Sequence, residues 1–67
     1  MDIYAKKGTK IKFTNPNNGR AHDQETAKKH LTVGHDYTVK ATDVSDWHTD
    51  VFIKEIPGVA FNVVMFE

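Results

Sequence analysis

The sequence contains no cysteine, so neither a disulfide framework nor a thiolate zinc site can hold the fold together. It also lacks any apolar run close to the roughly 20 residues that a membrane-spanning helix needs. The N-terminal segment does not have the long apolar core of a signal peptide. We therefore expect a cytoplasmic protein that is stabilised by packing alone and does not act at a membrane.

The chain is also short. Its 67 residues predict one domain spanning 1–67, and a domain of this size buries only about 60% of the surface that its unfolded chain exposes. We therefore expect a thin core without a deep, enclosed active site. The sequence predicts a protein that is not an enzyme and binds no cofactor.

The net charge is zero, but the two signs are unevenly distributed along the chain. Residues 1–20 contain five basic residues and one acidic residue, whereas residues 41–67 contain one basic and five acidic residues. This asymmetry predicts either two solvated faces that partly compensate each other or separate basic and acidic docking surfaces.

Alternation of apolar and polar residues predicts the first strand. Within Gly8–Thr14, lysines alternate with Ile11 and Phe13, as in a strand with one buried and one solvated face. The following residues, Asn15–Gly19, combine proline, glycine and three asparagines, which favour turns. We therefore expect a strand followed by a loop.

The next segment predicts a short helix over Asp23–Leu31. Asp23 is a residue type that commonly caps a helix N-terminus, and Ala27 and Leu31 fall on one helical face. A helix of about two turns is marginal in isolation, so we expect it to depend on docking against the sheet.

The second half of the chain is rich in strand signals. One strand should begin near Asp36, and a second should span Thr49–Ile56, which is dense in β-branched and aromatic residues. The intervening residues Ser45–His48 predict a hairpin tip. Pro57 and Gly58 match the central pair of a type II turn.

The C-terminal stretch completes the predicted sheet. Asn62 interrupts an apolar run, which indicates a tight bend before a last short strand at Met65 and Phe66. Together these elements predict a mainly β protein, a small five-stranded barrel with one short helix inserted after the first strand. Closing the sheet would protect its edges.

Two runs, LTVGHDYTV and WHTDVFIKEIPGVAFNVVMFE, resemble small bacterial and phage-encoded proteins, themselves uncharacterised, that have an SH3-like β-barrel. The resemblance covers residues 31–67 and concerns packing positions, such as the spacing of Leu31, Gly34 and Tyr37. It implies an SH3-like barrel, but a shared fold does not assign a function.

The histidines do not form a recognisable metal motif. There are four of them, at His22, His30, His35 and His48. No pair of these shows ligand spacing, so we expect solvent-exposed histidines and no metal site. Ser45, His48 and Asp50 have the residue types of a nucleophilic triad, but three residues on one exposed hairpin cannot supply an oxyanion hole.

Trp47, the only tryptophan, gives the clearest indication of a binding surface. At a hairpin tip its ring can either fold back as a lid over the core or project as an aromatic anchor of the kind found in binding hot spots. Asp46, His48 and Asp50 would form a polar rim in either case. We therefore predict a protein-binding surface at these four residues.

Nucleic acid is the alternative partner, because small barrels often bind it. A set of lysines that we call the lysine face lies on and before the first strand: Lys6, Lys7, Lys10 and Lys12. Single-strand binding combines such a basic track with exposed aromatic rings, but phosphate would be repelled by the acidic C-terminal half. Imperfect closure of the barrel also permits a weak homodimer, so we expect a monomer or a weak homodimer.

Overall fold

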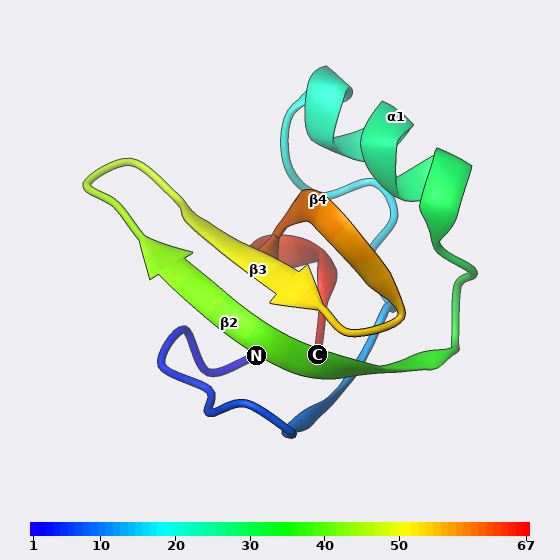
Figure 1. The fold of residues 1–67 in the computed structure, drawn as a ribbon. Helices are drawn as coiled ribbons and strands as arrows, with labels where there is room; N and C mark the ends of the chain where they lie inside the picture. Colours follow the sequence, from blue (N-terminus) through cyan, green and yellow to red (C-terminus); the bar gives the residue numbers. More distant parts are fainter.

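The computed structural model describes all residues from 1 to 67 and shows a mainly β protein (Figure 1). The elements in chain order are β1 (Lys10–Lys12), α1 (Ala21–His30), β2 (Asp36–Val44), β3 (Thr49–Ile53), β4 (Ile56–Asn62) and the 3₁₀ helix η1 (Val63–Met65). The four strands form one antiparallel sheet in the order β1-β2-β3-β4.

The sheet is open and has four strands, so the prediction of a closed five-stranded barrel is wrong, and an SH3-like fold is not confirmed. The Asn62 side chain accepts a hydrogen bond from the Val64 N–H at 3.1 Å, and the chain turns there into η1 instead of continuing as a strand. The predicted bend is thus confirmed. The predicted last strand is reduced to one isolated bridge between Phe13 and Phe66.

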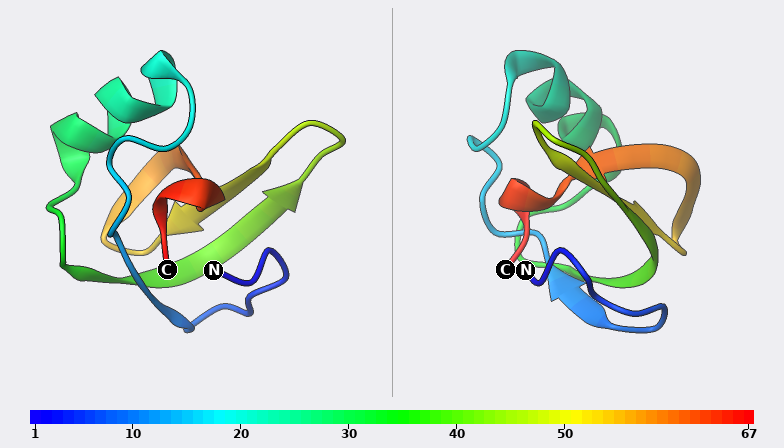
Figure 2. Two further views of the ribbon diagram at one scale, coloured as in Figure 1. Left: turned by 180° about the vertical axis from the view of Figure 1, so that it is seen from behind. Right: turned by 90° about the vertical axis from the view of Figure 1, so that its left-hand side faces the viewer.

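The β2–β3 hairpin is confirmed, with its tip at the predicted residues. Val44 pairs with Thr49 across the four-residue loop Ser45–His48. This loop extends beyond the rest of the sheet in both face-on views (Figures 1 and 2). The hairpin therefore carries its tip away from the body of the molecule.

The turn after β3 differs from the prediction. Ile53 pairs with Ile56, so the chain reverses at residues 54 and 55, before Pro57 and Gly58. The latter two lie within β4, where the register with β3 shifts. An irregular position suits them because proline has no N–H to donate and Gly58 has a φ of +82°.

The helix begins two residues earlier than predicted, at Ala21, with Arg20 as its N-cap residue. Asp23 is the third helical residue, and its carboxylate accepts a hydrogen bond from the Arg20 backbone N–H at 3.0 Å. Ala27 and Leu31 are buried, as expected. This face docks α1 beside β4 (Figure 1).

Twelve buried residues form one hydrophobic core. Within it, the ring of Phe66 connects those of Phe13 and Phe61, with centroid distances of 5.7 Å and 6.4 Å respectively. The N-terminal amine donates to the Phe66 carbonyl at 3.1 Å, and the two termini lie side by side (Figure 2).

The ten-residue α1 is too short and too polar to cross a membrane.

Candidate functional site

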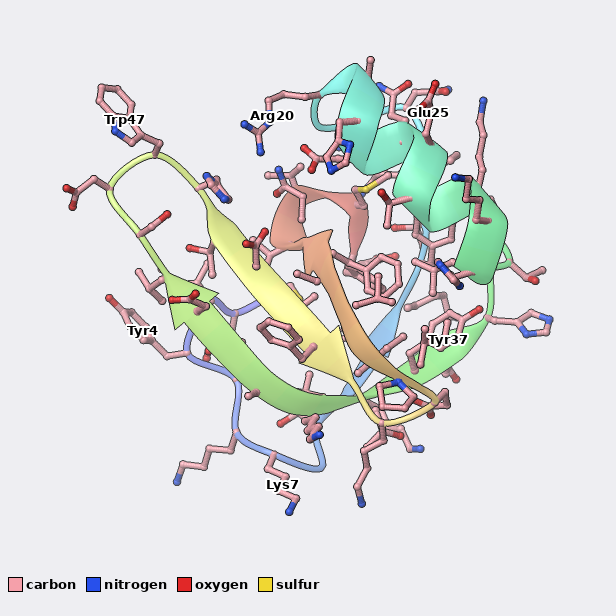
Figure 3. The ribbon with its side chains drawn as sticks, turned by 45° about the horizontal axis from the view of Figure 1, so that its top comes forward. Tyr4, Lys7, Arg20, Glu25, Tyr37 and Trp47 are labelled. Atoms are coloured by element: carbon pink, nitrogen blue, oxygen red, sulfur yellow. The ribbon has the colours of Figure 1, made fainter.

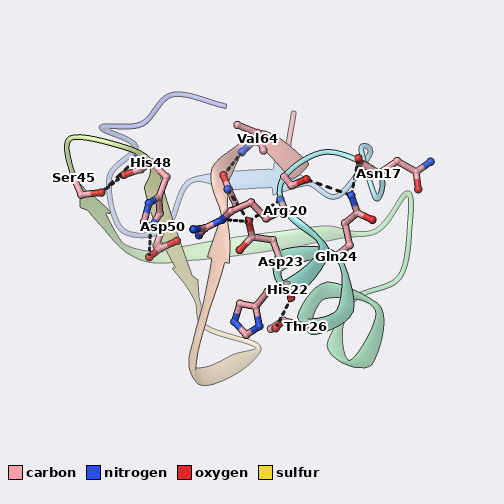
Figure 4. Close-up of polar contacts among 12 residues, drawn as sticks. Asn17, Arg20, His22, Asp23, Gln24, Thr26, Ser45, His48, Asp50 and Val64 are labelled. Atoms are coloured by element: carbon pink, nitrogen blue, oxygen red, sulfur yellow. Dashed lines mark hydrogen bonds and ion pairs between the residues drawn. The ribbon is translucent and has the colours of Figure 1, made fainter.

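The end of the β2–β3 hairpin, which we call the hairpin arm, comprises residues 42–50. Its loop is fixed by hydrogen bonds between Ser45 and His48 (Figure 4). The Ser45 N–H and hydroxyl both donate to the His48 carbonyl, the former at 3.0 Å, and the His48 N–H lies 3.4 Å from the hydroxyl oxygen. The loop therefore presents Asp46 and Trp47 at its outer end.

Trp47 is the most exposed large hydrophobic residue, with 94% of its surface accessible to solvent. Its ring points away from the body of the molecule (Figure 3). The interpretation of Trp47 as a lid on the core is therefore wrong. The reason is the position of the loop, which lies beyond Thr49, the last buried residue at this end of β3.

The polar rim around Trp47 contains one more acidic residue than the sequence analysis predicted. Asp46 is exposed, and the Asp50 carboxylate lies 3.4 Å from Nε2 of the half-buried His48. Asp43, which was not among the predicted residues, lies directly opposite Asp50 in the β2–β3 register. Pairing the residues on either side of the predicted loop, outward from Val44 and Thr49, would have identified this like-charged pair.

The geometry of the arm does not match that of a nucleophilic triad. The Ser45 hydroxyl donates to the backbone carbonyl of His48, while the imidazole faces Asp50. A triad requires the serine hydroxyl to bond the imidazole. The structure contains no pocket, and no three histidine, aspartate or glutamate side chains are grouped to hold a metal ion.

All four residues of the lysine face are exposed, as expected, but acidic groups lie among them. Lys10 Nζ donates to the Thr38 hydroxyl at 2.6 Å, and Thr38 in turn donates to Glu55 from its N–H and its hydroxyl, both at 3.0 Å. Lys12 pairs in register with Asp36. The lysine face is therefore partly neutralised.

The protonation of Glu55 follows from these contacts. Desolvation raises the pKa of the Glu55 carboxyl, but the hydrogen bonds from Thr38 and the charge of Lys10 outweigh this effect. The pKa thus lies below its usual value, and Glu55 is a carboxylate at neutral pH.

A second polar cluster joins the helix to the end of the sheet. Asp23 Oδ2 accepts hydrogen bonds from the Arg20 N–H at 3.0 Å, from Arg20 Nε at 3.3 Å and from Asn62 Nδ2 at 3.1 Å (Figure 4). Desolvation raises the pKa of the Asp23 carboxyl, but these hydrogen bonds and the charge of Arg20 lower it by a larger amount. The pKa therefore lies below its usual value. The cluster is internally satisfied, which indicates a structural role.

Comparison with known proteins places this chain among phage proteins. The model of the family described as bacteriophage T4 protein Y07B matches residues 2–67. No curated protein and no solved structure is similar enough to count as a match. The family match agrees with the predicted resemblance to small phage-encoded proteins, whereas none of the comparisons supports an SH3-like barrel. Because the match spans almost every residue, the chain belongs to the bacteriophage T4 protein Y07B family.

Proposed function

We propose that this protein is a small, non-catalytic protein-binding or regulatory accessory module, and that its contact surface is the hairpin arm. The observation that supports the proposal is the exposed Trp47 at the end of a hydrogen-bonded loop. Burying this ring against a partner would remove a large apolar surface from water. A loop that is already fixed loses little conformational entropy in doing so.

The surroundings of Trp47 suit a binding surface. Val44, at the base of the loop, is 44% exposed and adds apolar area, while Asp46, His48 and Asp50 provide hydrogen-bonding groups around it. Protein interfaces commonly consist of a few aromatic anchors with a polar rim. The arm therefore offers both components on one short segment.

The test is affinity capture from a lysate of phage-infected bacteria, with proteins identified by mass spectrometry. Wild type is compared with Trp47→Ala and with Tyr4→Ala, whose side chain is also exposed, at 72%. NMR spectra first establish that both variants are folded. A partner retained by wild type and Tyr4→Ala but lost by Trp47→Ala is expected. Equal capture by all three would contradict the proposal.

Tyr4 supports a second candidate function, the binding of single-stranded nucleic acid by the lysine face. Its exposed ring lies close in sequence to the exposed Lys6 and Lys7, so a stacking aromatic accompanies the basic track. Glu55 and Asp36 weaken this candidate by placing negative charge beside Lys10 and Lys12. Salt-dependent binding of oligonucleotides that is lost in a Lys6→Glu, Lys7→Glu variant would favour it over the arm.

A further inference from the structure

The hairpin arm carries negative charge without compensating lysine or arginine. Residues 42–50 include Asp43, Asp46 and Asp50, and contain neither basic residue type. The one ion-pair contact on the arm joins Asp50 to His48, and it is a charged pair only when the imidazole is protonated. The arm is thus an acidic surface around an exposed indole ring.

The two strands of the arm place like charges directly opposite each other. Asp43 on β2 faces Asp50 on β3, and like-charged cross-strand pairs are unfavourable. Neither Asp43 nor Asp46 makes an ion pair. A positively charged group bound between these carboxylates would remove the repulsion, so charge complementarity selects a cationic occupant.

The exposed indole of Trp47 indicates which kind of cationic group would bind. An indole face attracts cations, and the planar guanidinium of arginine can stack on it while its N–H groups bond carboxylates. An arginine side chain on Trp47 would lie within the reach of the neighbouring Asp46. The exposed Val44 provides apolar area for the methylene stem of a second basic side chain.

We infer that the hairpin arm binds an arginine-bearing segment of a partner protein, with one guanidinium stacked on Trp47 and further basic side chains paired with Asp43, Asp46 and Asp50. This inference rests on the proposed function, and it specifies the chemistry of the partner.

The test uses the full-length, ¹⁵N-labelled protein and three synthetic peptides of equal length. One alternates arginine with glycine, the second lysine with glycine, and the third glutamate with glycine. We expect the arginine peptide to shift the Trp47 indole signal and the amide signals of residues 42–50, more strongly than the lysine peptide and less strongly as salt is added. The glutamate peptide should shift neither set of signals.

Matched variants assign the contacts. Trp47→Ala should weaken binding of the arginine peptide about two- to fivefold, as expected for an exposed cation–π contact. Asp43→Asn and Asp50→Asn should also weaken it, whereas Glu25→Gln, which alters an exposed carboxylate on α1, should leave it unchanged (Figure 3).

Several outcomes would overturn the inference. It fails if the arginine peptide leaves the arm signals unchanged, or if Glu25→Gln weakens binding as much as Asp43→Asn. It also fails if arm signals shift with protein concentration alone, because the occupant would then be a second copy of this chain. If Trp47-dependent capture from the lysate persists in any of these cases, the proposed function stands and only the cationic chemistry is wrong.

Discussion

The side-chain amide of Asn62 donates a hydrogen bond to Asp23 Oδ2 at 3.1 Å, and this contact ties the start of α1 to the end of β4. Asn62 is 6% exposed, so its amide has little access to water as a substitute partner. Oδ1 of the same side chain accepts a hydrogen bond from the N–H of Val64, the second residue of η1. One residue thus makes contacts both to the helix and to the turn that leads from β4 into η1.

Asn62→Ala should therefore lower the free energy of unfolding by about 1–3 kcal/mol, because it removes the hydrogen bond to Asp23 Oδ2 and the one from the Val64 N–H. Urea denaturation measures the change. The double variant with Asp23→Ala should lose less than the sum of the two single changes, since both remove the same contact. Strict additivity would show that the Asp23–Asn62 contact contributes nothing.

Gly19 should tolerate substitution less well than Gly58. Both residues have a φ of +82°, so alanine is strained at either position. At Gly19, however, a Cβ would lie only 3.2 Å from the Asp23 Cβ and Oδ2, whereas at Gly58 nothing lies within 4 Å. Urea denaturation should therefore show a larger loss for Gly19→Ala than for Gly58→Ala. Equal losses would mean that the loop shifts to accommodate the methyl group.

Acid should destabilise the fold through Asp23 and Glu55, whose pKa values are lowered in the native state. Both carboxyls remain ionised at pH values where the unfolded chain has already bound protons. Their stabilising contribution is complete above the usual carboxyl pKa of about 4 and is lost as the pH falls through their lowered native values. The free energy of unfolding should thus decline below about pH 4.

Asp23→Asn tests this assignment. The variant should be less stable than wild type at neutral pH, and the difference between the two should shrink under acidic conditions, where the wild-type carboxyl is protonated. Urea denaturation at several pH values measures both trends. A difference that stays constant down to about pH 2 would contradict the ionic role of Asp23.

Truncation of two aromatic residues should change the free energy of unfolding by very different amounts. Trp47→Ala should change the free energy of unfolding by no more than about 0.5 kcal/mol, because the ring is 94% exposed. Phe66→Ala should cost about 3–5 kcal/mol, since its ring is 3% exposed and contacts two other phenylalanines. Thermal unfolding compares them. A large loss for Trp47→Ala would show that the ring packs on the core after all.

Local patterns in the sequence predicted most of the elements. The alternation around Ile11 and Phe13 corresponds to β1 and to the isolated bridge at Phe13, and both side chains are buried. The loop Ser45–His48 and the buried face of α1 at Ala27 were also predicted correctly. These features depend on neighbouring residues alone, so periodicity and turn chemistry are sufficient to find them.

Features that depend on distant contacts were not predictable in this way. The path of the chain after β4 depends on Asn62, whose bonds to Val64 and Asp23 accompany the turn into η1. Whether Trp47 covers the core depends on how far the arm extends beyond Thr49. The acidic rim was found only in part, because Asp43 enters it through cross-strand register.

The most direct test of Trp47 as a binding anchor is an NMR spectrum of the ¹⁵N-labelled protein in an unlabelled lysate of phage-infected bacteria. Trp47 is the only tryptophan, so its indole N–H gives a single assignable signal. We predict that this signal and the amide signals of residues 42–50 shift or broaden in the lysate, while those of α1 remain in place. Unchanged arm signals alongside shifted signals of the lysine face would contradict the account.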